Sequence, residues 1–294
     1  MLLSRNTKEI IIKNIFLVIA ATSIFIILFI FYFLFSQGIP AFETLGGKLF
    51  SNEWSVAKGE FGLGAAIFGT LIVTGVAMLI AVPLGILSAI FLAELAPRKL
   101  RLILKPIIEL LAGIPSIVYG FIGAVLLVPY LQPNFGMLSG YSYLAGSLIL
   151  AIMALPIIIS MSDDAIKAVP RNFKEASLAV GATKWQTIKK ITLPSAISGI
   201  SAAVVMGIGR AIGEKMAVSL VLGNMMEIPA PPFDLFETTG TTLTALIVNQ
   251  MGEATDIQTS VLFVAAVILF IVVAILSISS NILRERIEKK FKGA

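Results

Sequence analysis

The sequence predicts an all-α membrane protein that crosses the bilayer with six helices. Of its 294 residues, 57% are hydrophobic and 13% are charged, and the mean hydropathy is +0.98. A soluble domain of this length could not bury so much apolar surface, so lipid is the solvent for most of the chain. A spanning helix needs about 20 apolar residues. The stretches that meet this length are 15–35, 65–92, 103–130, 143–161, 197–222 and 260–282, and we expect a single transmembrane domain over 1–294.

The distribution of Lys and Arg predicts that both termini lie in the cytoplasm. Eighteen of the 22 cations fall at the N-terminus, at the C-terminus, in the link after the second span and in the link after the fourth. Outside these segments and the fifth span, the only cations are Lys48 and Lys58. Because cytoplasmic loops of membrane proteins are enriched in cations, we expect a multi-pass protein of the cell membrane with both ends inside. The basic runs report orientation, so nucleic acid is not expected as a partner.

The residue types exclude most chemistry within this chain. Cysteine and histidine are both absent, which removes thiol nucleophiles, the commonest general base and the commonest metal ligands. We therefore expect no catalytic residue and no metal site. The phosphate-cradling pattern G-x-x-x-x-G-K-[ST] is also absent, so the chain cannot bind and split ATP alone. We expect no cofactor in this chain.

Prolines and glycines predict irregular points inside the spans. Pro83, Pro115 and Pro156 each remove a backbone donor and kink or break a helix. The densest break is 113–116, where we expect the third helix to change direction. After the fifth span, a Thr cap before Leu243 predicts a short helix over 243–251, at the outer interface or as a re-entrant piece.

The fifth span carries three charged residues near its middle, Arg210, Glu214 and Lys215. One charge at the centre of a span costs about 2.5–3.5 kcal/mol on insertion scales, so such residues mark functional sites by default. Residues four apart share a helical face, so we expect Arg210 to pair with Glu214. A guanidinium matches the oxygens of phosphate or sulfate. The span therefore predicts a polar pathway for an anion, although an ion pair that only locks the bundle is an alternative.

The cytoplasmic loop 163–194 is the second candidate site. Residues 172–180 read as a short amphipathic helix, Gly181 breaks it, and residues 183–191 read as a second helix. Pro194 is expected in the first turn of the fifth span. A structured loop of this length is typical of a segment that contacts a partner.

This loop resembles the cytoplasmic coupling motif of binding-protein-dependent ABC importer permeases. The matching residues are Glu175, Ala176, Gly181, Ile191, Leu193 and Pro194. Ser177 replaces the more usual second Ala. The resemblance implies the type I ABC importer permease fold, in which this segment forms a coupling helix that docks on an ATP-hydrolysing subunit. ATP and magnesium would then be used by that partner.

A narrower resemblance covers most of the chain. Residues 111–121, 209–214, 242–245 and 252–254 look like the phosphate-import permeases, and 216–218 with 223–224 are similar to the C type of the two paralogous subunits. The resemblance implies that Arg210 and Glu214 act in phosphate passage. Lys215 stands where a small hydroxyl residue is common. The implied partners are a paralogous permease in a heterodimer, an ATP-binding subunit dimer and an external phosphate-binding protein.

Other functions remain open on the sequence. A permease for sulfate, molybdate or phosphonate would share most of these features. An ion-coupled secondary anion carrier would use Glu214 as a proton site and would have no use for the loop. A membrane scaffold or sensor partner would leave Arg210 replaceable without loss of transport.

Overall fold

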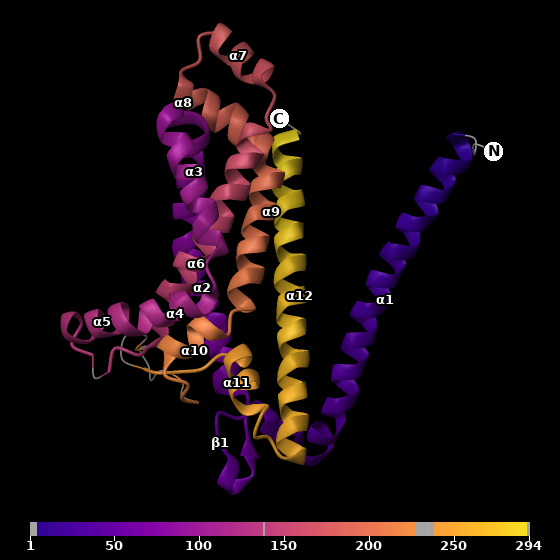
Figure 1. Cartoon of the computed structure of the whole chain (residues 1–294), viewed down its shortest axis with the longest axis vertical. Coiled ribbons are helices and arrows are strands. Elements are labelled where there is room, and N and C mark those ends of the chain that lie inside the picture. Colours follow the sequence, from indigo (N-terminus) through magenta and orange to yellow (C-terminus); the bar gives the residue numbers. More distant parts are fainter. Residues whose placement is uncertain (1–4, 138, 227, 229–233, 235–237, 293–294) are drawn as a thin grey trace.

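The structure, a computed structural model, describes residues 5–137, 139–226, 228, 234 and 238–292. Six of its helical runs are long and apolar enough to cross a membrane, which confirms the predicted number of spans. α1 (Arg5–Leu45) begins, and α12 (Asp256–Lys292) ends, at the end of the molecule where α7 (Arg171–Ala179) and α8 (Lys184–Thr187) lie (Figure 1). This arrangement agrees with two cytoplasmic termini.

Between α1 and α12 the chain forms short and long elements in the following order. They are the 3₁₀ helix η1 (Gly46–Phe50), β1 (Trp54–Ser55), the 3₁₀ helix η2 (Val56–Lys58), β2 (Glu60–Phe61), α2 (Gly64–Ile90), the π-helix η3 (Phe91–Leu95), α3 (Arg98–Gly113), α4 (Ser116–Ile122), the π-helix η4 (Gly123–Leu127), α5 (Val128–Asn134), α6 (Tyr143–Lys167), α7, α8, the π-helix η5 (Ile188–Thr192), α9 (Leu193–Ile212), α10 (Met216–Leu222) and α11 (Leu243–Gln250). The antiparallel hairpin β1–β2 pairs Trp54 with Phe61 at the external end.

The core of the bundle is built around α6, which packs against α2 and α9. Small residues allow the close approach, since Ala77 and Ala81 of α2 and Ala154 of α6 are fully buried in one cluster with Ile158. A Cβ added at Gly207 of α9 would lie 2.7 Å from the Ile158 side chain. Small residues at helix contacts are the usual means of packing inside a bilayer.

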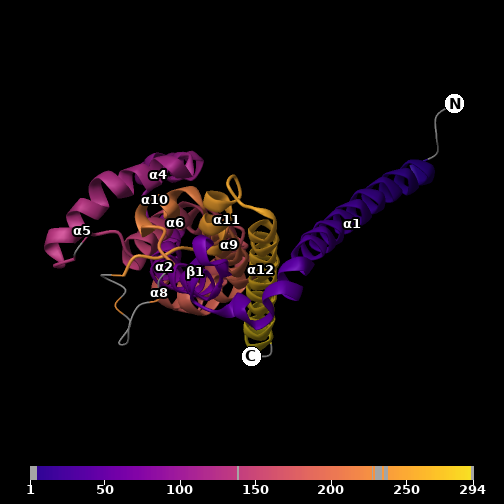
Figure 2. The same ribbon diagram turned by 90° about the horizontal axis from the view of Figure 1, so that it is seen from below.

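α1 stands apart from this bundle. Its axis diverges from α12 toward the cytoplasmic end, and only its external part meets α12 (Figures 1 and 2). There Phe31 packs on Phe270 and Phe33 on Phe263, with ring centroids 5.1 and 6.0 Å apart. The apolar side chains of the cytoplasmic half of α1 are exposed.

The expected third span, 103–130, is wrong in its bounds. α3 ends at Gly113, and the candidate span is Ser116–Asn134, formed by α4, η4 and α5. The change of direction expected at 113–116 is confirmed, because α4 and α5 lie across the axis of α3 (Figure 1). Pro115 supplies an extended residue at the break, with ψ of 136°.

Two further expectations are corrected at the cytoplasmic end. The fourth span continues as α6 to Lys167 and includes Asp163, which was expected to follow it. The second loop helix does not end before the fifth span, since α8, η5 and α9 form one helical run, Lys184–Ile212. Pro194 lies near the start of α9, as expected. The short helix predicted from the Thr cap is α11, whose Ala245 N–H donates to the Thr242 hydroxyl.

Candidate functional site

The fifth span is broken where its charges lie. α9 ends at Ile212 and α10 begins at Met216, so Gly213, Glu214 and Lys215 form the connection. The predicted continuous helix 197–222 is therefore wrong in this middle part. Glu214 is 7% exposed, and its carboxylate Oε1 accepts hydrogen bonds from Met216 N at 3.0 Å and Ala217 N at 3.1 Å. The carboxylate thus caps the otherwise unsatisfied N–H groups at the start of α10.

The expected ion pair between Arg210 and Glu214 does not form. Because the helix ends between them, the i,i+4 relation is lost and Glu214 turns to the backbone of α10. The Nε of Arg210 is buried and has no hydrogen-bond partner in the described part of the chain. An unsatisfied buried donor is costly. Arg210 therefore keeps an unsatisfied donor beside the break, among the residues that the structure describes.

Two further elements hold the break in place. Thr244 of α11 donates from its hydroxyl to the Glu214 carbonyl at 3.1 Å. On the other side, α4 packs on α10, and a Cβ added at Gly120 would lie 2.7 Å from the Ala217 Cα. The sequence alone does not mark Thr244 or Gly120 as site residues. The sequence feature that could have indicated them is a small or hydroxyl-bearing residue inside an apolar segment, which is typical of close helix packing in membranes.

Tyr119 links the two broken spans. Its hydroxyl donates to the Leu111 carbonyl at 2.8 Å, so it bridges the break between α3 and α4. The same side chain is 8% exposed and lies within electrostatic range of Arg210. Because α4 also packs on α10, the breaks of the third and fifth spans are neighbours.

The cytoplasmic helix pair has the local structure expected from the sequence. α7 ends before Gly181, whose φ of +86° suits glycine. Thr183 and Gln186 form a capping box at the start of α8. Ser177, which stands in place of the more usual Ala, contacts Thr187 through hydroxyl oxygens 3.0 Å apart and so ties α7 to α8.

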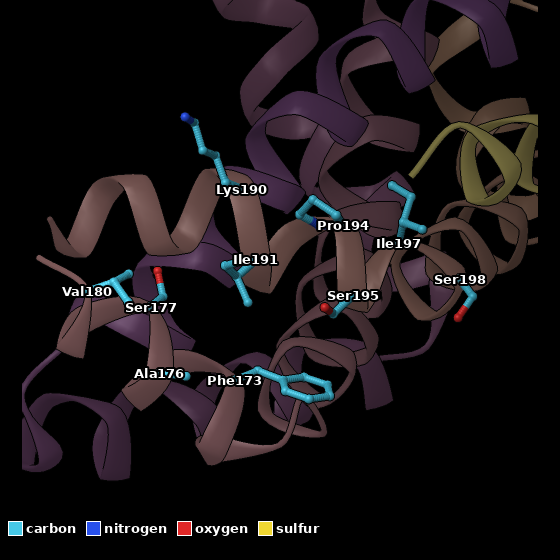
Figure 3. Close-up of a pocket in the computed structure, with 10 residues that line it drawn as sticks. All are labelled: Phe173, Ala176, Ser177, Val180, Lys190, Ile191, Pro194, Ser195, Ile197 and Ser198. Atoms are coloured by element: carbon cyan, nitrogen blue, oxygen red, sulfur yellow. The ribbon is translucent and has the colours of Figure 1, made fainter. Parts of the chain in front are cut away.

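A groove of about 750 Å³ separates α7 from the start of α9. Figure 3 shows Ile191 of η5 pointing toward α7 and Lys190 pointing away from it. Three residues of the predicted coupling motif, Ala176, Ile191 and Pro194, line the groove, together with Phe173, which is 56% exposed. Glu175 is exposed on α7, and Leu193 packs against the buried cluster below the groove. The structure thus gathers the motif on one cytoplasmic surface.

Charged pairs attach this surface to the bundle. Lys174 of α7 meets Glu94 of η3 with Nζ and Oε1 2.6 Å apart. Beside them, the fully buried Asp163 contacts Lys167 at 2.5 Å and Lys105 at 3.4 Å. A hydrogen bond from Lys105 to Asp164 raises the pKa of Lys105, so this lysine remains charged at neutral pH. The pairs of Lys174 with Glu94 and of Lys105 with Asp163 were not predicted, since their members lie far apart in the sequence, whereas Asp163 and Lys167 are one turn apart on α6.

Comparison with known proteins identifies the class. Residues 81–293 match the model of the family described as "Binding-protein-dependent transport system inner membrane component". A bacterial alginate ABC transporter, solved in complex with an alginate pentasaccharide-bound periplasmic protein, contains a chain with the same fold. That chain aligns with a TM-score of 0.65 at 18% identity, over 97% of this chain and 99% of its own length. The chain therefore belongs to the binding-protein-dependent ABC importer permeases and has their type I permease fold.

Within this family, several similar relatives are phosphate permeases. The phosphate transport system permease protein PstC of Mesorhizobium japonicum is 37% identical over 87% of this chain and 84% of its own length. The probable PstC of Methanocaldococcus jannaschii is 36% identical over 90% of each chain. The probable ABC transporter permease YqgH of Bacillus subtilis is 43% identical over 76% of this chain and 73% of its own. The chain is thus a PstC-type permease, a multi-pass protein of the cell membrane.

Proposed function

We propose that this chain is the membrane-spanning subunit of an ATP-driven phosphate importer. The observation that carries the proposal is Arg210, whose buried Nε, at a break of the fifth span, has no hydrogen-bond partner among the described residues. An arginine so placed supplies planar donors that fit tetrahedral oxyanions. Its curated relatives include permeases named for phosphate transport, which supports phosphate over other oxyanions.

In this proposal Arg210 is a transient stop for the anion rather than a tight site. Glu214 contributes indirectly, since its carboxylate holds the start of α10 instead of pairing with Arg210. Lys215 is exposed beside the break and adds a second cation to the pathway. Selectivity comes mainly from an external phosphate-binding protein, and the permease needs only to attract and release its cargo.

ATP hydrolysis belongs to a separate pair of subunits. The partners are a paralogous permease that completes a heterodimer, an ATP-binding subunit dimer that uses ATP and magnesium, and the phosphate-binding protein. The coupling surface for the ATPase is formed by Glu175, Ala176, Gly181, Leu193 and Pro194. Its exposed apolar side chains, with Phe173 56% and Val180 85% exposed, are suited to a protein partner.

The test is uptake of labelled phosphate into proteoliposomes that contain the complete importer, its binding protein outside and ATP inside. Arg210→Gln should reduce uptake at least about tenfold, because the loss of a charge-assisted contact costs on the order of 1.5–3 kcal/mol. Arg98→Gln, an exposed cation on the cytoplasmic side, is the matched control. Near-normal uptake by Arg210→Gln in an assembled complex would remove the proposed role.

The same vesicles separate the alternatives. Sulfate, molybdate and phosphonate are offered in place of phosphate with their own binding proteins, and uptake of one of these without phosphate uptake would reassign the cargo. Uptake driven by a proton gradient without ATP would instead identify a secondary carrier. The Glu214 carboxylate is engaged by two N–H groups at the start of α10, which gives it a structural role, and this is the reason we prefer the ATP-driven mechanism.

A further inference from the structure

Three neutral polar side chains meet on the external side of the break. The Ser219 hydroxyl lies 3.1 Å from the Asn224 Oδ1, and the Asn249 Nδ2 lies 3.1 Å from the Ser219 Oγ and 3.2 Å from the Asn224 Oδ1. Asn224 also donates from Nδ2 to the Ser219 carbonyl at 2.7 Å. Ser219 belongs to α10 and Asn249 to α11, so the cluster joins two elements that are 30 residues apart.

The cluster lies between the break and the outer end of the bundle. α10 and α11 are neighbours near the external end (Figure 1), and they touch at their starts through Thr244 and Glu214. α11 then runs outward for about 12 Å, because Gln250 at its end bonds Gln258 in the first turn of α12 at 3.0 Å. Asn249 therefore stands at the outer end of α11, and Glu214 at its inner end.

Lys215 shares a face with this cluster. The Ser219 N–H donates to the Lys215 carbonyl at 3.1 Å, one helical turn away, so both side chains project from the same side of α10. That side is open, whereas Ala217, Val218 and Val221 on the other side are fully buried. Lys215, Asn224 and Asn249 are exposed. Exposed amides and a cation are unfavourable against lipid, so this face borders a polar space.

The backbone supports the same interpretation. Asn224, with φ of 57°, is the non-glycine residue that adopts a positive φ among those the structure describes. Such conformations are costly and cluster at functional sites. Each primary amide carries two N–H donors. Asn224 uses one on the Ser219 carbonyl and retains the other, whereas the Asn249 Nδ2 already lies within hydrogen-bond distance of both Ser219 and Asn224 and holds the exposed cluster together.

We propose that Lys215, Ser219, Asn224 and Asn249 form an outer polar track that conducts a tetrahedral oxyanion from the external surface to Arg210. The proposal rests on the function proposed above. Amide and hydroxyl donors bind an anion without a counter-charge, so they release it readily, and Lys215 provides the attraction toward the break. The track supplies the outer half of the pathway, while Arg210 supplies its middle.

The first test places a negative charge on the track without changing its shape. Asn249→Asp is nearly isosteric and should repel the anion, so that uptake falls at least about tenfold relative to wild type. The matched control is Asn134→Asp on α5, an exposed asparagine that changes the net charge of the chain equally. Both importers are purified, checked for assembly and assayed with labelled phosphate in ATP-loaded proteoliposomes.

The second test does not depend on how well the aspartate variant folds. The chain contains no cysteine, so Asn249→Cys can be labelled after assembly with cysteine-free partner subunits. We expect an externally added anionic sulfonate reagent to block uptake, and a cationic ammonium reagent of similar size to block it much less. Asn134→Cys should respond equally to both reagents.

The outcomes separate the two proposals. If wild type imports phosphate and the two Asn→Asp variants transport equally, the track is wrong and the proposed function stands. If wild type imports sulfate or molybdate instead, the proposed cargo is wrong, and the same comparison is made with that anion. Failure of the external reagents to reach Asn249→Cys in the assembled importer would also overturn the track, since it would mean that a partner covers this face.

Discussion

The ion pair between Lys174 and Glu94 connects the helix pair of the cytoplasmic loop to the second span. Lys174 lies on α7, and Glu94 lies in the π-helix η3 that ends the second span. The Nζ and Oε1 are 2.6 Å apart, and the side chains are 21% and 13% exposed. Arg101 holds the same π-helix through the Leu92 carbonyl at 2.7 Å. We therefore expect a force on α7 to reach the second span directly through this pair.

The magnitude follows from burial and distance. A hydrogen bond between charged groups contributes about 1.5–3 kcal/mol, and removal of one partner from a fully buried pair costs about 3–5 kcal/mol. Lys174 keeps about a fifth of its surface in water, so the lower range applies. We expect Lys174→Met and Glu94→Gln each to lower the free energy of unfolding by about 2 kcal/mol, with a coupling energy of about 1.5–3 kcal/mol in a double-mutant cycle.

The functional assay is transport per ATP hydrolysed in the reconstituted importer. Lys174→Met should lower this ratio by about tenfold, whereas Lys184→Met, an exposed lysine of α8, should leave it near wild type. The exchanged pair Glu94→Lys with Lys174→Glu should recover much of the loss. The reasoning is refuted if Lys174→Met transports normally, or if the exchanged pair behaves no better than either single charge reversal.

Two further predictions concern the break. Gly120→Val should destabilise the protein by about 1–3 kcal/mol, because its Cβ would meet the Ala217 backbone. Gly113→Ala is the control, since a Cβ at Gly113 has open space around it. Thermal unfolding of the purified permease measures both variants, and equal midpoints would contradict the contact of Gly120 with Ala217. Glu214→Ala should reduce phosphate uptake more than Glu214→Gln, since glutamine keeps an oxygen for the Met216 and Ala217 N–H groups. A greater loss of uptake in the glutamine variant would point instead to a role for the charge of Glu214.

Hydropathy and cation placement predict the number and direction of the spans well. The length of an apolar stretch is read directly from neighbouring residues, so it predicts the spans. Pro115 predicts the break of the third span because proline removes a backbone hydrogen-bond donor. The capping residue Thr242 was equally visible, since its hydroxyl acts on a backbone N–H three residues away. The Glu175–Pro194 motif likewise predicts the cytoplasmic helix pair, because the spacing of its residues depends only on helical turns that are adjacent in the sequence.

Long-range partners were not visible in the sequence. Arg210 and Glu214 fit a pair at helical spacing, but Glu214 instead satisfies the first N–H groups of α10, which exist only because the helix ends. The contact of Lys174 with Glu94 spans 80 residues. The β1–β2 hairpin has strands of two residues, too short for an alternating pattern.

Because α8, η5 and α9 form one continuous helical run, a movement at its cytoplasmic end can be transmitted to the middle of the membrane. The run Lys184–Ile212 contains 29 residues, which corresponds to a rod of about 43 Å, and Arg210 lies in its last turn. A rotation of about 20° about the rod axis moves a side-chain tip at a radius of about 6 Å by about 2 Å. Such a displacement is enough to take a guanidinium out of hydrogen-bond range. In the mechanism proposed above, a small twist applied at the cytoplasmic end would therefore decide whether Arg210 holds or releases an anion at the middle of the membrane.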